Sequence, residues 1–131
     1  MSTSLVIVTH DLIGKELLHS TGTILGKQDI PVYNISVTHH DNPDKILDTI
    51  SKLIESIDKK HDILIMTDLY GATPCNIVNR ISAQKRIRII TGINLSMLIK
   101  AFNYANTLPI EQLAEKVTNG GQQGIFVCPT E

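Results

Sequence analysis

Short apolar segments rich in β-branched residues, separated by helical patterns, constrain the fold of this chain more than any other feature of its sequence. Uninterrupted apolar runs of this kind are typical of strands that are buried on both faces of a sheet. The last run follows Gly120 and Gly121, which predict a turn. The expected strands are Leu5–Val8, Val32–Ser36, Ile63–Thr67, Ile87–Thr91 and Ile125–Cys128.

Helical patterns fill the intervals between the expected strands. The clearest covers Pro43–Lys59, where apolar residues recur along one helix face. Asn42 and Pro43 are residue types favoured at a helix N-cap and first position. Other helices are expected over Leu12–Leu25, Leu95–Phe102, Glu111–Val117 and from Thr73 onward. This alternation predicts an α/β three-layer sandwich, with a mainly parallel, doubly wound central sheet and a short C-terminal strand.

The composition limits the classes of function. With 131 residues, 42% of them hydrophobic and 19% charged, the chain is expected to fold as one domain over residues 1–131. Because 13 acidic residues balance its 12 basic ones, the chain has no excess of positive charge with which to bind a nucleic acid. Leu5–Val8 follows no basic region and is too short to span a bilayer, so the sequence predicts a cytoplasmic protein without membrane insertion. Cys75 and Cys128 match no zinc pattern, and we expect both to be free thiols in buried positions.

Polar residues follow the expected strands at their carboxyl ends, where parallel sheets bind their ligands. His10 follows the first strand, and Asp68 follows the third, which commonly lies beside the first in doubly wound folds. A carboxylate that accepts a hydrogen bond from one imidazole nitrogen leaves the other nitrogen as a nucleophile. His10 and Asp68 are therefore the candidate catalytic residues. Taken alone, each also fits an ordinary structural role in a strand-end loop.

The segment after Asp68 predicts an anion site. Gly71 allows a tight turn, Thr73 is a favoured N-cap and Pro74 a favoured first helical residue. Free N–H groups and the positive end of the helix dipole would then attract a small anion. Simple helix capping is the alternative. Taken together with His10 and Asp68, this segment suggests transient phosphorylation of His10.

Two further histidines, His39 and His40, follow the second expected strand. Adjacent loop residues rarely point in the same direction, which argues against both binding one metal ion. We expect a solvated turn before the Asn42 cap, and the sequence predicts no metal site.

Three segments together resemble the enzyme IIA component of the mannose/fructose/sorbose family of the bacterial phosphoenolpyruvate-dependent sugar phosphotransferase system. The first is Val8–Leu18, with a histidine that ends a strand and opens a helix. The second is Asp68–Asn76, where an aspartate precedes a turn of small residues and Thr-Pro. The third is Thr91–Leu98, where Gly-Ile-Asn leads into Met-Leu. The resemblance covers nearly the whole chain.

This resemblance implies a complete relay. His10 would accept a phosphoryl group on Nε2 from the histidine-containing phosphocarrier protein, while Asp68 would hold Nδ1–H. Gly71, Ala72 and Thr73 would bind the phosphate oxygens. The group would then pass to a histidine of an enzyme IIB component, with no nucleotide or metal cofactor, in association with a membrane permease complex. Family members are homodimers whose C-terminal strand, here Ile125–Cys128, pairs with the other subunit.

The sequence departs from the family pattern at two positions. Asp11 stands where glycine is usual, and its carboxylate should repel a phosphoryl group on His10 unless it points away or pairs with a base such as Lys15. Ala72 stands where glycine is often found. The enzyme IIB domain that some relatives carry is absent from the sequence, so a regulatory role is expected as readily as one in uptake.

Three alternatives remain open from the sequence. A response-regulator receiver would be phosphorylated on Asp68, but it needs an acidic pair after the first strand, where only Asp11 is available, and a lysine after a later strand. The phosphocarrier subunit of a dihydroxyacetone kinase shares the chemistry and differs in its acceptor. A non-catalytic regulatory binding module of the same fold would explain why an acidic residue, Asp11, follows His10.

Overall fold

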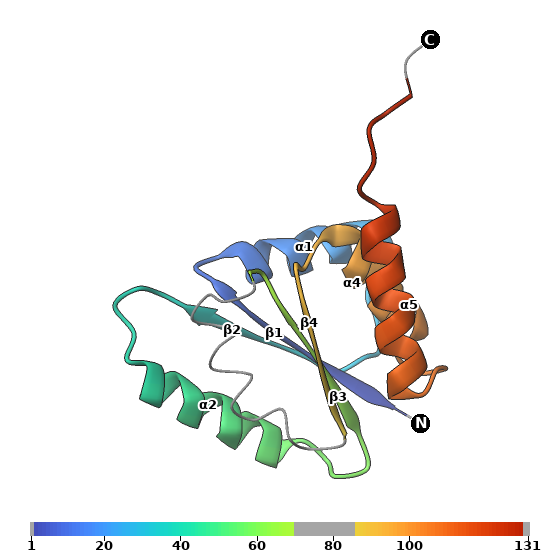
Figure 1. Cartoon of the computed structure of the whole chain (residues 1–131). Coiled ribbons are helices and arrows are strands. Elements are labelled where there is room, and N and C mark those ends of the chain that lie inside the picture. Colours follow the sequence, from blue (N-terminus) through green and yellow to red (C-terminus); the bar gives the residue numbers. More distant parts are fainter. Residues whose placement is uncertain (1, 70–85, 130–131) are drawn as a thin grey trace.

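The computed structural model describes residues 2–69 and 86–129, and within them the chain forms three layers around one parallel sheet (Figure 1). The strand order is β2-β1-β3-β4, and all three pairings are parallel. The strands are β1 (Thr3–His10), β2 (Val32–Val37), β3 (Asp62–Thr67) and β4 (Ile87–Thr91). The predicted α/β three-layer sandwich with a parallel sheet is confirmed.

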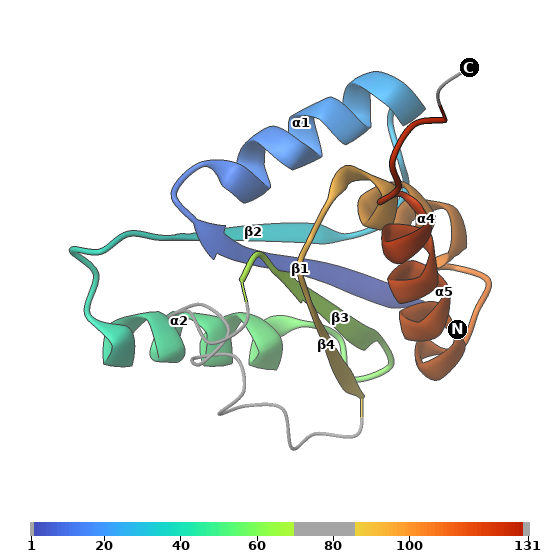
Figure 2. The same cartoon turned by 45° about the horizontal axis from the view of Figure 1, so that its top comes forward.

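Helices cover both faces of this sheet (Figure 2). One face carries three of the described helices, and the other carries α2. The four helices of the described residues are α1 (Ile13–Leu25), α2 (Pro43–Ser56), α4 (Leu95–Tyr104) and α5 (Ile110–Gln123). None of these helices is both long and apolar enough to cross a membrane.

The two central strands explain why the sequence reads as uninterrupted apolar runs. In β1, Leu5 and Ile7 pack under α1, α4 and α5, while Val6 and Val8 pack against α2, and all four side chains are fully buried. Successive side chains of a strand point to opposite faces, so a sheet covered on both faces requires apolar residues at every position. The core is therefore two clusters separated by the sheet.

Helix α2 forms where the N-terminal signals predict it. The Asn42 side chain accepts a hydrogen bond of 2.8 Å from the Asp44 N–H, and Pro43 is the first helical residue. Three isoleucines at helical spacing, Ile46, Ile50 and Ile54, are buried against the sheet. The helix ends at Ser56, before the expected end at Lys59.

The connection between β1 and α1 is held by one buried hydroxyl. Thr9 Oγ1 accepts a hydrogen bond of 2.8 Å from the Gly14 N–H. A Cβ atom at Gly14 would lie 2.5 Å from Asn34 Oδ1 and 2.8 Å from Ile7 Cγ2, so the first turn of α1 packs directly onto the sheet. The glycine that weakens the helix pattern in the sequence is thus required by close packing, and it sets the path of the loop that follows His10.

The predicted turn at Gly120 and Gly121 is wrong, since both residues lie inside α5, which extends to Gln123. Both glycines are buried against α4. A Cβ atom at Gly120 would collide with the Lys100 side chain, and one at Gly121 with Met97. Close approach of two helices, rather than reversal of the chain, therefore requires glycine here.

The predicted strand Ile125–Cys128 forms no strand within the described part of this chain. The segment leads away from the body of the molecule (Figure 1), with Ile125 74%, Phe126 69% and Val127 93% exposed. Cys128 is a free thiol, as expected, but it is exposed, so its predicted burial is wrong. Pairing of this segment with another subunit stays a prediction.

Two glycines of α1 allow a matched test of this packing. Gly14→Ala should lower the free energy of unfolding by about 1–3 kcal/mol, because the new methyl group overlaps Asn34 and Ile7. Gly22→Ala meets open space and should raise it by about 0.5–1 kcal/mol, because alanine has the higher helix propensity. Urea unfolding of both variants measures the difference. Equal stability of the two variants would contradict the packing described here.

Candidate functional site

The pairing of β1 with β3 brings His10 and Asp68 together, 58 positions apart in the chain. Val8 is in register with Thr67, so the residues that follow the two strands meet at the carboxyl edge of the sheet. The His10 Nδ1 atom lies 2.9 Å from Asp68 Oδ2. The predicted meeting of these two side chains is therefore observed.

The Asp68 carboxylate is held by three N–H groups. Its Oδ2 atom accepts hydrogen bonds from the His10 ring and, at 3.0 Å, from the His10 backbone N–H. Its Oδ1 atom accepts one of 3.0 Å from the Leu69 N–H. Because one oxygen binds both the ring and the backbone of His10, the imidazole has a fixed orientation relative to the end of β1.

The electrostatics of this pair fix the imidazole tautomer. Burial by itself raises the pKa of Asp68, but the hydrogen bonds from His10 and the attraction of a protonated ring outweigh it, so the pKa of Asp68 lies below its ordinary value. The carboxylate is then ionised at neutral pH and can only accept hydrogen bonds. Nδ1 must carry the proton in a neutral His10 ring, which leaves the lone pair on Nε2.

Exposure divides the roles of the two side chains. The His10 side chain is 39% exposed, whereas that of Asp68 is 13% exposed. Both hydrogen bonds to Asp68 involve Nδ1 or the backbone N–H of His10, and no residue in the described ranges forms a hydrogen bond with Nε2. The imidazole is thus partly exposed to solvent, while the carboxylate that orients it is shielded.

Asp11 adopts a left-handed backbone conformation, with φ of +45°. Its N–H donates a hydrogen bond of 3.0 Å to the Val37 carbonyl oxygen, which ties the loop to the end of β2. Glycine adopts this conformation without strain, and aspartate tolerates it better than most residues. The turn after His10 therefore explains a preference for glycine at this position, where this chain has aspartate.

Other residues singled out in the sequence lie outside the described ranges or away from His10 and Asp68. Gly71, Ala72 and Thr73, the candidate phosphate-binding residues, lie outside the described residues, as does Cys75. His39 and His40 are exposed in the connection from β2 to α2, which agrees with a solvated turn. Their ring centroids are 3.8 Å apart, so the expectation that the two side chains point in different directions is wrong. No group of three or more metal-binding side chains occurs within residues 2–69 and 86–129.

Sequence reasoning missed the role of the Thr9 hydroxyl. Besides accepting from Gly14, it donates a hydrogen bond of 3.2 Å to the His10 carbonyl oxygen, so it fixes the backbone on both sides of the loop. A polar residue at the end of an otherwise apolar run, five positions before a glycine, was the available signal.

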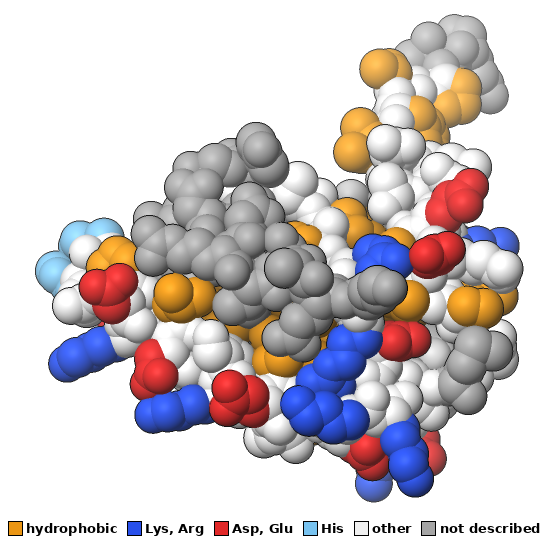
Figure 3. Space-filling model, turned by 60° about the horizontal axis from the view of Figure 1, so that its bottom comes forward, with side chains coloured by type: hydrophobic (Ala, Val, Ile, Leu, Met, Phe, Trp, Pro, Cys, Tyr) orange, Lys and Arg blue, Asp and Glu red, His pale blue; other side chains and the backbone are white. Residues whose placement is uncertain are grey.

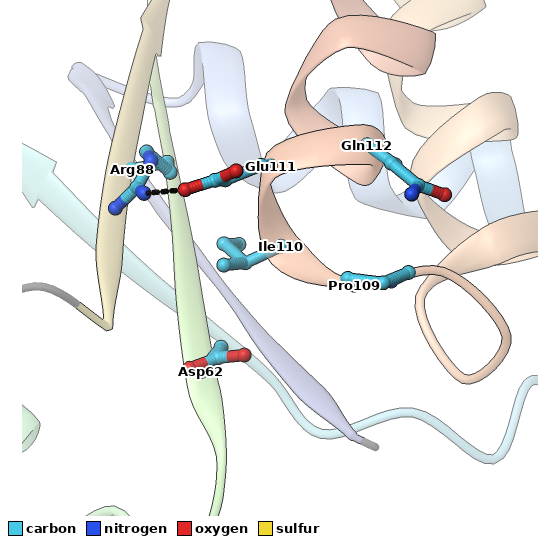
Figure 4. A pocket seen from close by; sticks show the side chains of 6 residues that line it. All are labelled: Asp62, Arg88, Pro109, Ile110, Glu111 and Gln112. Carbon is cyan, nitrogen blue, oxygen red and sulfur yellow. Dashed lines mark hydrogen bonds and ion pairs between the residues drawn. The ribbon is translucent and has the colours of Figure 1, made fainter.

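A cavity of about 560 Å³ lies away from this pair. It is lined by residues of β3, β4 and the start of α5, and Asp62 at its wall is the first residue of β3 (Figure 4). The Arg88 guanidinium and the Glu111 carboxylate form an ion pair of 3.1 Å there. The cavity therefore lies toward the amino end of β3, opposite the edge where His10 and Asp68 meet.

Charges of both signs mix on the face of the molecule that α2 covers (Figure 3). Acidic and basic side chains are both visible there, in agreement with the formal net charge of -1 of the whole sequence.

Comparison with known proteins identifies the family. A family model described as "PTS system fructose IIA component" matches residues 4–118. The chain belongs to this family. The resemblance seen in the three sequence segments is thereby confirmed.

Individual relatives agree with this assignment. The mannose-specific EIIAB component of the sugar phosphotransferase system of Escherichia coli (strain K12) is 24% identical over 127 residues, which is 95% of this chain and 39% of that protein. The fructose-specific EIIA component of Bacillus subtilis (strain 168) is 22% identical over 126 residues, covering 95% of this chain and 86% of that protein. This chain thus spans well under half of the first relative and most of the second.

The fold agrees as well. A mannose/sorbose-specific IIA subunit from Enterococcus faecalis superposes with a TM-score of 0.86 at 25% identity, over 100% of this chain and 98% of that one. The arrangement of helices around the parallel sheet is therefore the one found in this family.

The lowered pKa of Asp68 predicts how stability depends on pH. The ionised carboxylate should stabilise the folded state above about pH 4, the ordinary pKa of an aspartate, and this stabilisation should disappear as the pH falls through the lower pKa of the folded state. Asp68→Asn should therefore cost about 1–2 kcal/mol at neutral pH and progressively less in acid.

Urea unfolding at a series of pH values from about 7 to about 2 measures this difference. Asp29→Asn is the matched control, because Asp29 is exposed and makes none of the described contacts. A cost of Asp68→Asn that stays constant over the whole series would contradict the ionised pair.

Proposed function

We propose that this chain is a phosphohistidine carrier of a sugar phosphotransferase system. His10 accepts a phosphoryl group from the histidine-containing phosphocarrier protein and passes it to a histidine of an enzyme IIB component. The observation that carries this proposal is the 2.9 Å contact between Asp68 Oδ2 and the Nδ1 atom of an accessible imidazole. Family membership supports the same conclusion.

The first step is nucleophilic attack by Nε2. Its lone pair forms a bond to the phosphorus atom, while the bond from phosphorus to the donor's imidazole nitrogen breaks and its electron pair returns to the donor. The His10 ring becomes positively charged, and its Nδ1 proton stays on the hydrogen bond to Asp68. An ionised carboxylate at that position stabilises this charge, as in other activated histidines.

The second step reverses these roles. A histidine of the enzyme IIB component attacks the phosphorus, the bond to Nε2 breaks, and His10 recovers its neutral form with the proton still on Nδ1. Because the proton never leaves Nδ1, the relay needs no separate acid or base at this atom. The proposed transfer also needs no nucleotide or metal ion.

Gly71, Ala72 and Thr73 are proposed to bind the oxygens of the transferred group. In the sequence they begin three positions after Asp68, whose carboxylate is bonded to His10. Partner proteins of the relay act in the cytoplasm, where we place this chain, in association with a membrane permease complex.

The proposed transfer is tested by reconstitution. Incubation with phosphoenolpyruvate, enzyme I and the phosphocarrier protein should give one phosphate that is labile in acid and stable in base. His10→Ala should lose it completely, and Asp68→Asn should slow its formation at least tenfold, because the tautomer is no longer fixed. His19→Ala, on an exposed part of α1, is the control that should be phosphorylated normally.

Two outcomes would overturn the proposal. Label that persists in His10→Ala would place the nucleophile on another residue. A chain that takes up no label from an active phosphocarrier protein would favour the non-catalytic binding module.

We also propose that the chain is a homodimer through its C-terminal segment. Ile125, Phe126 and Val127 are large apolar side chains exposed on an extended segment, and β4 is an edge strand of the sheet in the described chain. Exposed apolar segments and open strand edges both mark interfaces. Pairing of the segment with the sheet of a second subunit would cover both.

This dimer is tested by sedimentation. Phe126→Asp and Val127→Asp together should convert a dimer to a monomer, because two charges would be buried at the proposed interface. Ile24→Asp, another exposed apolar position, should leave the dimer intact. A wild-type chain that sediments as a monomer at high concentration would refute the proposal.

A further inference from the structure

We propose that the side-chain hydroxyl of Thr67 is a further phosphate-binding group of the site. In the unphosphorylated chain this hydroxyl has no partner among the described residues. Once His10 carries a phosphoryl group, the hydroxyl donates a hydrogen bond to one of the phosphoryl oxygens. This inference rests on the proposed function and adds to it a residue of β3 itself, one position before Asp68.

The Thr67 hydroxyl differs from the other buried hydroxyls near the sheet. Within the described part of the chain, its Oγ1 atom is the one buried side-chain oxygen or nitrogen that lacks a hydrogen-bond partner. Ser4, Thr9 and Thr21 are also buried, and their hydroxyls form hydrogen bonds of 3.1, 2.8 and 2.8 Å respectively. Buried polar groups in folded proteins are normally bonded, so the exception at Thr67 requires an explanation.

Packing in β3 does not explain a threonine at this position. The four preceding residues of the strand, Ile63–Met66, are apolar and fully buried. Valine has nearly the same shape as threonine and a similar preference for strands, and a buried hydroxyl without a partner destabilises the folded state. The backbone at Thr67 is also fixed, because its carbonyl oxygen accepts a hydrogen bond of 2.9 Å from the Ile93 N–H. A function in another state of the protein accounts for the hydroxyl.

The register of the strands places Thr67 and His10 on the same face of the sheet. Thr67 is in register with Val8, and His10 is in register with Val37. Val8 and Val37 both pack in the cluster under α2, and residues two apart in a strand point to the same face. His10, two positions after Val8, therefore shares the α2 face with Thr67. Strand spacing and rise put the Cα atoms of Thr67 and His10 about 8 Å apart.

A phosphoryl group on Nε2 would supply the missing partner. It carries up to about two negative charges, and its three oxygens are strong hydrogen-bond acceptors. A hydrogen bond from a neutral hydroxyl to a charged oxygen is strong, particularly where no water competes for it. Because Thr67 is fully buried, its neighbours shift slightly when the phosphoryl group enters. The hydroxyl thereby exchanges an unpartnered state for a charge-assisted hydrogen bond, which favours the phosphorylated form.

Thr67→Val separates this role from packing, because its two expected effects have opposite signs. The equilibrium constant for phosphoryl transfer from the phosphorylated histidine-containing phosphocarrier protein should fall roughly tenfold, because a hydrogen bond to a charged oxygen is lost. The urea midpoint of the unphosphorylated variant should equal or exceed that of wild type, because an unpartnered hydroxyl is removed. Thr91→Val, at an exposed position in register with Thr67 on β4, is the matched control and should leave the equilibrium unchanged.

A second pair of variants isolates the hydroxyl even if valine disturbs the fold. Thr67→Ser and Thr67→Ala both remove the methyl group and differ from each other in the hydroxyl alone. The serine variant should keep the transfer equilibrium within about twofold of wild type, whereas the alanine variant should lower it roughly tenfold. Phosphorus NMR of the phosphorylated chains gives an independent measurement. The phosphohistidine resonance of the serine variant should match wild type, and that of the alanine variant should be displaced.

The outcomes separate this inference from the proposed function. A wild-type chain that takes up no phosphate from the active phosphocarrier protein refutes the proposed function itself. A wild-type chain that is phosphorylated, with Thr67→Val at the same equilibrium, refutes the role of Thr67 alone. A lower urea midpoint for Thr67→Val, or equal equilibria for the serine and alanine variants, would assign the residue to packing and likewise refute it.

Discussion

The hydrogen bond between His10 and Asp68 depends on the pairing of β1 with β3, and the rest of the site depends on that bond. The two strands are the most deeply buried in the described chain, because helices cover both of their faces. Their carboxyl ends therefore lie at fixed positions relative to each other. A carboxylate that binds both the ring and the backbone of His10 converts this rigidity into a single orientation of the imidazole.

The helices and strands could be predicted from local patterns in the sequence, and the pair formed by His10 and Asp68 from the places of these residues at the ends of two strands. Continuous apolar runs identify strands covered on both faces, and the Asn42-Pro43 signal identifies the start of α2. The place of Asp68 beside His10 follows from the usual order of a doubly wound sheet, so it required no knowledge of side-chain contacts. The first expectation concerns patterns that short segments determine by themselves, and the second depends on the usual order of strands in this class of fold.

The errors concern features that distant residues determine. Gly120 and Gly121 have the composition of a turn, yet the tight contact of α5 with α4 keeps them in a helix. Ile125–Cys128 has the composition of a strand, but a strand needs a neighbour to pair with, and within the described chain it has none. The positive φ of Asp11 and the two hydrogen bonds of the Thr9 hydroxyl arise from the geometry of the β1–α1 connection. The residue types alone do not reveal this geometry.

The division between buried strands and exposed loops has a consequence for how members of this family can vary in sequence. His10 and Asp68 are anchored to the interior of the sheet, whereas Leu12, Ile13 and Leu69 project from connections that bear little of the core. Substitutions in these connections can therefore change the exposed surface near His10 in the sequence while the strand ends that orient its imidazole stay in place.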